Sequence, residues 1–177
     1  MIHNSIFSLA HYFPVRYYQH SEIFSQRIIK LKRANRSAID YFANSFNSHF
    51  KPVHHEYIAV PVPSSEKNVT NGITYVCKKL AKLNSNIKYV HNAIFRNKSV
   101  ESFCKSNHRS IDTIRSSISI NYSAVNGKHI LLIDDITTTG TTLLTIKQML
   151  IAAGAASVSC CACAQTFYYS LTIPPKT

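Results

Sequence analysis

Apolar positions along this chain fall into short continuous runs that alternate with helical stripes. Continuous runs bounded by turn residues are typical of buried parallel strands, whereas apolar residues spaced three and four apart indicate a helix with one buried face. The runs predict strands over residues 57–63, 87–95, 129–134 and 158–164, with a further candidate over 167–173. Strands that alternate with helices predict an α/β fold, with a doubly wound, mainly parallel sheet flanked by helices.

The helical stripes place two helices ahead of the first predicted strand. One begins after Ser21, and the second carries large apolar residues from Ile39 to Phe50 on one face, which is typical of core packing. Further helices are predicted over residues 71–83, 109–115 and 143–153. We expect a single domain over residues 1–177, with a helical N-terminal or hood part over 1–52 and a sheet core over 53–177.

One segment joins an apolar strand to candidate chemistry. Residues 130–133 are apolar, Asp134 and Asp135 follow them, and a polar turn then leads into a predicted helix. The turn consists of Thr137, Thr138, Thr139, Gly140, Thr141 and Thr142. Carboxylates at the carboxyl end of a strand lie where open α/β sheets bind ligands, and the first N–H groups of a helix suit a phosphate. The segment therefore predicts a pocket for a phosphorylated ribose.

Two other interpretations of this segment are less consistent with the sequence. A strand that ends in two acids also resembles the magnesium-binding strand of P-loop ATPases, which requires a G-x-x-x-x-G-K-[ST] loop elsewhere. The four glycines, Gly72, Gly127, Gly140 and Gly154, do not have that spacing. The second interpretation is a buried strand with solvated acids and a polar turn. The conjunction of strand, acid pair and threonine–glycine turn argues against both.

Charge adds a second indication of an anionic partner. The chain carries 20 Lys and Arg residues against 8 Asp and Glu residues, a net charge of +12. Ten of the basic residues, against three acids, fall within residues 61–120. A basic surface attracts nucleic acid and equally a substrate with several phosphates, so charge alone does not separate these classes.

Cysteine usage and hydropathy indicate the compartment. The five cysteines are odd in number and form no C-x-x-C pair, a pattern that favours buried free thiols in a reducing cytosol over disulfides or a zinc site. Cys160, Cys161 and Cys163 are predicted to lie in the core. No apolar run is long enough to cross a membrane, and the first residues lack a secretory signal pattern. We expect a cytoplasmic protein without a membrane partner.

The acid pair and the loop that follows resemble the ribose-phosphate loop of the type I phosphoribosyltransferases, which bind 5-phosphoribosyl 1-pyrophosphate. The resemblance implies that Asp134 and Asp135 hold the ribose 2′- and 3′-hydroxyls and that residues 137–142 wrap the 5′-phosphate. It also implies magnesium as the cofactor, bridging the diphosphate and the ribose hydroxyls, so that the two acids meet the metal indirectly.

The order of several segments is similar to the ComF (competence protein F)-like branch of that family. These segments are residues 28–33, the Pro-rich residues 60–63, a basic loop, the acid-pair strand and residues 152–155. Many ComF-like proteins carry an N-terminal cysteine-rich zinc ribbon, and this chain has no cysteine before Cys77.

The resemblance also implies a pyrophosphate side of the site. The turn after residues 60–63 would contribute Ser64, Ser65 and Lys67, although the family usually has several arginines there. Lys67 and Arg109 are expected to act in catalysis, closing over the diphosphate together with Lys105. In the hypoxanthine–guanine branch an aspartate of the phosphate loop assists the purine, and Thr138 matches that position here. Ordinary 6-oxopurine salvage is therefore not expected.

Three functions remain open at this stage. The first is a phosphoribosyltransferase, a pentosyl glycosyltransferase that acts on an undefined acceptor. The second is a non-catalytic protein that senses phosphoribosyl pyrophosphate or a nucleotide. The third is a ComF-like protein associated with DNA uptake or with a retron phage-defence system, whose partner is single-stranded DNA, RNA or a DNA-processing protein. Its candidate contacts are Tyr12, Phe13, Arg16, Tyr17, Tyr18, Lys30, Lys32, Arg33 and Arg36. A homo-oligomer is also considered.

Overall fold

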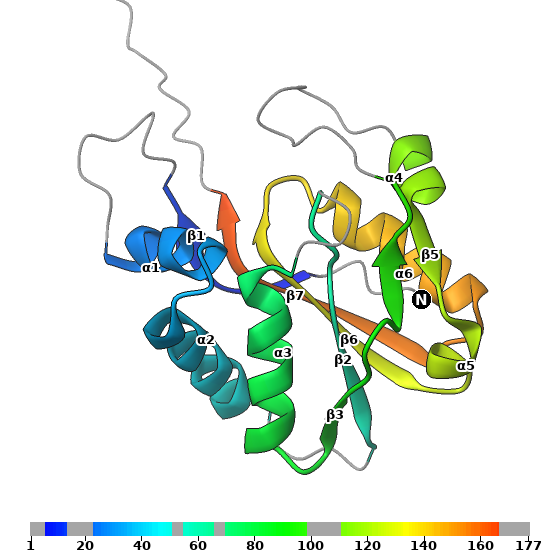
Figure 1. Cartoon of the computed structure of the whole chain (residues 1–177), viewed down its shortest axis with the longest axis horizontal. Helices are drawn as coiled ribbons and strands as arrows, with labels where there is room; N and C mark the ends of the chain where they lie inside the picture. Colours follow the sequence, from blue (N-terminus) through cyan, green and yellow to red (C-terminus); the bar gives the residue numbers. More distant parts are fainter. Residues whose placement is uncertain (1–5, 14–22, 51–54, 66–69, 99–110, 167–177) are drawn as a thin grey trace, which may run out of the picture.

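A five-stranded sheet in which every neighbouring pair is parallel forms the centre of the structure (Figure 1). The structure is a computed structural model that describes residues 6–13, 23–50, 55–65, 70–98 and 111–166. The strand order is β1-β7-β6-β2-β3. The strands are β1 (Ile6–Tyr12), β2 (Tyr57–Pro61), β3 (Ile87–Tyr89), β6 (His129–Thr137) and β7 (Ser157–Thr166).

Helices cover both faces of this sheet, so the predicted doubly wound α/β class is confirmed (Figure 1). One face carries α1 (Ile23–Lys32), α2 (Arg36–His49) and α3 (Gly72–Leu83). The other face carries α4 (Ile111–Ser117), α5 (Tyr122–Val125), α6 (Thr141–Ala152) and an antiparallel ribbon of β4 (Ile94–Arg96) and β5 (Ile118–Ile120).

Residues 130–133 of β6 are all apolar because both faces of the strand are buried there. Successive side chains of a strand point to opposite faces. Accordingly, Leu131 and Ile133 pack in the core beneath α2 and α3, whereas Ile130 and Leu132 pack in the core beneath α6. The continuous apolar run that predicted this strand is the consequence of the two-sided burial.

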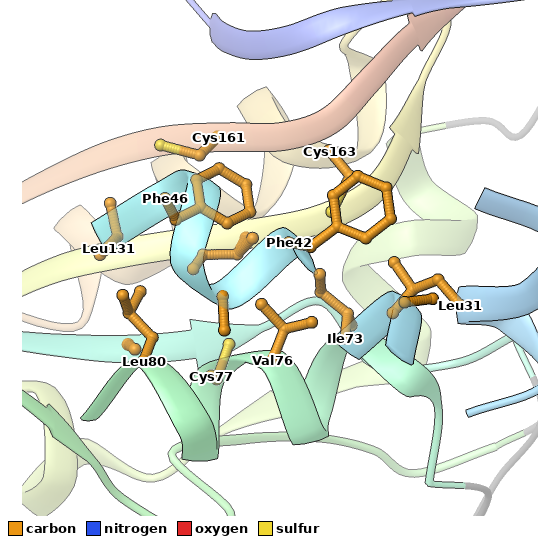
Figure 2. Packing of buried hydrophobic residues seen from close by; sticks show 14 of the residues in the cluster. Leu31, Phe42, Phe46, Ile73, Val76, Cys77, Leu80, Leu131, Cys161 and Cys163 are labelled. Carbon is orange, nitrogen blue, oxygen red and sulfur yellow. The ribbon is translucent and has the colours of Figure 1, made fainter. Parts of the chain in front are cut away.

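The helix α2 anchors the core on its side of the sheet. Asn35 begins the helix by accepting a hydrogen bond at Oδ1 from the Ala38 backbone N–H at 3.3 Å. Figure 2 shows Phe42 and Phe46 pointing between α3 and the strands β6 and β7, and neither side chain is exposed to solvent. The predicted core role of this apolar stripe is confirmed.

The N-terminal part differs from its prediction in one respect. Residues 6–12, placed in a helical segment, form β1, which pairs in parallel with β7 at the edge of the sheet. The predicted strand over 87–95 is also interrupted. It divides into β3 in the main sheet and β4 in the ribbon, and Asn92 between them adopts a positive φ of 56°. The candidate strand over 167–173 lies outside the described residues.

The four cysteines in the described part of the chain behave as the sequence predicts, and Cys104 lies outside it. Cys77, Cys160, Cys161 and Cys163 are free thiols buried in the two cores. Burial raises the pKa of Cys160 to about 11, so this thiol is neutral at physiological pH and packs as a small apolar group. Within the described ranges, no helix is long and apolar enough to cross a membrane.

Candidate functional site

The strands β2 and β6 are neighbours whose following helices leave in opposite directions. The chain runs from β2 through α3 to β3 on one side, and from β6 through α6 to β7 on the other. Open α/β sheets bind ligands at such a switch point, in the crevice outside the carboxyl ends of the strands. The last paired residues are Pro61 and Ile133, and the Val62 N–H donates to the Ile133 carbonyl at 2.8 Å. The ladder thus ends immediately before Asp134.

The acid pair therefore lies at the mouth of this crevice. Asp134 and Asp135 are both half-buried and belong to β6, which continues to Thr137 by pairing with β7 alone. Asp134 Oδ1 accepts from the Asp135 backbone N–H at 2.8 Å, and Asp135 Oδ1 accepts from the Ile136 N–H at 2.7 Å. The Oδ2 atom of each carboxylate takes no part in these two backbone hydrogen bonds.

The electrostatics of the pair are asymmetric. Burial raises the pKa of Asp134 well above its usual range, and the negative charge of Asp135 raises it further. On the α1 side, Lys32 Nζ lies 3.8 Å from Asp135 Oδ2 and partly offsets this effect. The sequence predicts Lys32 only as a nucleic-acid contact, because nothing in the sequence around residue 32 indicates that it lies near the acid pair. Ionising Asp134 in the unliganded site is therefore unfavourable, and a nearby cation or ligand hydroxyls would reduce this cost.

The raised pKa gives a prediction for stability against pH. Because the folded state binds the Asp134 proton more tightly than the unfolded state, its contribution to stability is full at acidic pH and is lost as pH rises through the raised pKa. We expect Asp134→Asn to stabilise the unliganded protein by about 1 kcal/mol at neutral pH. The gain should fade towards about pH 4, near the usual pKa of the group. Urea unfolding of the wild type and of Asp134→Asn between neutral pH and about pH 4 measures this difference in stability. A stabilisation that increases on acidification would contradict the prediction.

The loop after β6 is shaped to receive an anion. Gly140 adopts φ +79°, in the left-handed region, and stands at the N-terminus of α6 with no side-chain cap. The Thr139 and Thr141 hydroxyls are hydrogen-bonded at 2.9 Å, and the Thr138 hydroxyl bonds to that of Thr166 at 3.0 Å. The N-terminus of α6 carries a partial positive charge and backbone donors, and the surrounding hydroxyls add further donors.

The strand β1 supports this loop from the edge of the sheet. A Cβ atom built on Gly140 would lie 2.5 Å from Ile6 Cδ1, so the glycine permits both the left-handed turn and the close approach of the strand. Thr137 is buried at the start of the loop. The predicted phosphate-loop residues 137–142 are therefore brought together as one turn at the carboxyl edge.

A second turn follows β2 on the other side of the crevice. Ser64 and Ser65 are half-buried in it. Its far end is tied back by Asn71, which donates from Nδ2 to the Val62 carbonyl at 3.3 Å and accepts at Oδ1 from the Thr74 N–H at 3.2 Å. Asn71 thereby caps α3 and holds the helix start beside the end of β2. The other residues predicted for the pyrophosphate side, Lys67, Lys105 and Arg109, lie outside the described residues.

Comparison with known proteins places this arrangement in a family. A family model for the phosphoribosyl transferase domain matches residues 73–166, the span from α3 to β7 that contains the acid pair and the phosphate loop. No curated protein sequence matches the chain. The fold and site define a doubly wound α/β protein with an acid pair and a threonine–glycine loop at its switch point. The chain belongs to the phosphoribosyltransferase-domain family.

Solved structures with a similar arrangement are distant in sequence. The allosteric regulatory enzyme of purine biosynthesis is 20% identical, with a TM-score of 0.49 over 71% of this chain and 25% of that chain. A hypoxanthine-guanine phosphoribosyltransferase from Bacillus anthracis is 14% identical, with a TM-score of 0.40 over 76% of this chain and 65% of that one. The hypoxanthine phosphoribosyl transferase of Trypanosoma cruzi is 15% identical, with a TM-score of 0.40 over 78% and 64%. The chain thus spans a quarter of the first protein and just under two thirds of the others.

Proposed function

We propose that this protein binds 5-phosphoribosyl 1-pyrophosphate with magnesium and displaces the pyrophosphate to attach an acceptor at ribose C1. The observation that carries the proposal is the joining of the acid pair to the left-handed Gly140 turn at the start of α6. Carboxylates accept hydrogen bonds from sugar hydroxyls, and the N–H groups at the start of a helix bind phosphate. The spacing of the two along one strand and turn suits a ribose 5-phosphate.

Different residues of the chain would bind the ribose 5-phosphate and the diphosphate parts of the ligand. Asp134 and Asp135 would orient the 2′- and 3′-hydroxyls, while the backbone N–H groups and hydroxyls of residues 137–142 would anchor the 5′-phosphate. The turn at Ser64 and Ser65 would face the diphosphate, and Lys67, Lys105 and Arg109 would add positive charge there. Such fixed groups stabilise the charge that develops as the diphosphate leaves, because they require no reorganisation.

The residues at the acid pair fit magnesium held jointly with the substrate. Among the described residues, no group of three or more His, Cys, Asp or Glu side chains is placed to hold a metal ion. Magnesium keeps several waters and is usually bound by one or two carboxylates plus substrate phosphates, which is what Asp134 and Asp135 would provide. When bound, it would neutralise charge on the diphosphate.

Calorimetry and product detection together test the proposal. The protein should bind phosphoribosyl pyrophosphate in the presence of magnesium and release pyrophosphate when a panel of bases and nucleosides is added. Ribose without phosphate serves as the control ligand and should not bind. Failure to bind the phosphoribosyl donor would overturn the proposal, whereas binding without release under any acceptor would remove the transfer step and leave a binding protein.

One observation favours that non-catalytic alternative. The Thr138 hydroxyl is bonded to the Thr166 hydroxyl at 3.0 Å, at the position where the resemblance to the hypoxanthine–guanine branch implies a carboxylate. A threonine does not exchange protons with a purine at neutral pH, so an acceptor would need another base. A sensor of phosphoribosyl pyrophosphate or of a nucleotide needs no such group.

A nucleic-acid role is supported by basic residues at the turn between α1 and α2, which adjoins the acid pair through Lys32. Four basic residues are exposed around the turn between α1 and α2, namely Lys30, Lys32, Arg33 and Arg36. Together with the ComF-like order of segments, this corner supports a role in DNA uptake or retron phage defence. Retention of single-stranded DNA or RNA should then fall steeply with salt, because each neutralised phosphate adds to the slope. Absence of retention at low salt would exclude this role.

A further inference from the structure

Arg96 is buried beside the turn that follows β2. It ends β4, and only 5% of the residue is exposed to solvent. Arginine is rarely buried to this extent unless its donors are satisfied, and its guanidinium stays charged inside a protein. A fixed positive charge therefore lies below the carboxyl edge of the sheet, in a position that the proposed mechanism does not yet use.

The guanidinium group holds the turn through its backbone. Its Nε donates to the Ser64 carbonyl, and its Nη2 makes a longer contact of 3.5 Å to the Pro63 carbonyl. On the other side, Nη1 donates to the Ser117 hydroxyl at 2.7 Å. Ser117 is itself buried at the end of α4, where its hydroxyl donates to the Ile114 carbonyl at 3.1 Å. Arg96 thus ties the turn after β2 to the end of α4.

This tie fixes the direction of the peptide groups in the turn. In a planar trans peptide the carbonyl and the N–H point in opposite directions. With the Pro63 and Ser64 carbonyls directed at Arg96, the N–H groups of Ser64 and Ser65 project from the other side of the turn. Successive N–H groups on one side of a turn form a concavity that binds anions.

The turn is also correctly placed for an anion at the crevice. It begins at Val62, whose N–H is bonded to the carbonyl of Ile133, the residue before Asp134. Pro63, Ser64 and Ser65 themselves carry no charged side chain. Arg96 supplies positive charge directly behind them, which strengthens the field that their N–H groups present.

We propose that Arg96 is a positioning residue for the diphosphate of the phosphoribosyl donor, acting through the peptide groups of the Pro63–Ser65 turn. This inference rests on the proposed function and extends it, because it assigns diphosphate recognition to a buried arginine outside the phosphate loop and the acid pair. Arg96 does not touch the ligand. It orients the turn that does and adds charge behind it.

Two ligands that differ only in the diphosphate test this assignment. Phosphoribosyl pyrophosphate with magnesium and ribose 5-phosphate share the sugar and the 5′-phosphate. We expect Arg96→Gln to lower the affinity for phosphoribosyl pyrophosphate by about tenfold or more, because hydrogen bonds from a charged group are lost. Affinity for ribose 5-phosphate should change by less than about twofold. Arg96→Lys keeps the positive charge but loses the planar set of guanidinium donors. Its affinity for phosphoribosyl pyrophosphate should therefore lie between those of the wild type and Arg96→Gln.

A matched control removes the same charge elsewhere. Arg27 is half-buried on α1, with its guanidinium 4.1 Å from the centre of the Tyr41 ring, on the opposite face of the sheet. Arg27→Gln should leave both affinities unchanged. Circular dichroism checks folding, and if Arg96→Gln is unfolded, Ser117→Ala replaces it, since it removes only the hydroxyl that Arg96 uses.

The outcomes separate this inference from the function on which it rests. Selective loss of the diphosphate ligand in the folded Arg96 or Ser117 variants supports it. An equal loss of both ligands, or no loss of either, overturns it and leaves the function intact. A wild-type protein that binds neither ligand overturns the proposed function itself.

Discussion

Replacing both acids of the pair, Asp134→Asn with Asp135→Asn, is expected to lower the affinity for phosphoribosyl pyrophosphate and magnesium by about 100-fold or more. Each carboxylate would lose a charge-assisted hydrogen bond to a ribose hydroxyl, and such bonds contribute about 1.5–3 kcal/mol each. Loss of charge would also weaken the hold on the magnesium that accompanies the diphosphate. Calorimetric titration of the unliganded protein measures the effect directly.

The same Asp-to-Asn substitution at a surface position controls for the general effect of removing a negative charge. Asp112 is exposed on α4, and Asp112→Asn should leave the affinity at the wild-type value. The double variant should also remain folded, because removing the buried charge of Asp134 relieves the unliganded protein. Wild-type affinity in a folded double variant would show that the acid pair does not hold the ribose.

The second large effect is expected at Gly140. Gly140→Ala places a side chain at φ +79°, which costs roughly 1–2 kcal/mol for an L-residue. The new Cβ would also lie 2.5 Å from Ile6 Cδ1, so β1 or the loop has to shift. We expect the free energy of unfolding to fall by about 2 kcal/mol and the affinity for ribose 5-phosphate to fall by about tenfold or more, because the N–H groups of α6 move.

The chain provides a second left-handed glycine as the control. Gly127 adopts φ +67°, and a Cβ built there meets nothing within 4 Å. Because of the backbone strain, Gly127→Ala should lower the free energy of unfolding in urea. Its affinity for ribose 5-phosphate should equal that of the wild type. If both alanine variants bind equally well, the turn at Gly140 does not hold the phosphate.

The elements that local pattern alone determines were the ones predicted well. The strand β6 is predictable because burial of both faces requires a continuous apolar run. The turn that follows is predictable because its residues, Asp134 to Thr142, are adjacent in the sequence. The start of α3 was equally local, since Asn71 caps it with its own side chain. In such segments, the residues that determine the structure are neighbours in the sequence as well as in space.

What escaped prediction depends on residues far apart in the chain. The segment that forms β1 mixes apolar and polar residues, and it becomes a strand only because β7 pairs with it. Lys32 reaches Asp135, and Arg96 reaches Ser64, across separations that no spacing rule encodes. The division of β3 from β4 arises likewise because β4 pairs with the distant β5.

The pairing of β1 with β7 has a consequence for how the protein is made. Among the described strands, β1 comes first in sequence and pairs only with β7, which comes last, so this pairing cannot form until Ser157–Thr166 has been synthesised. Contacts of this separation close slowly, because the intervening chain must be ordered first. During synthesis β1 is therefore unpaired until β7 has emerged, and the contact between Ile6 and the Gly140 loop is expected to form only after this pairing.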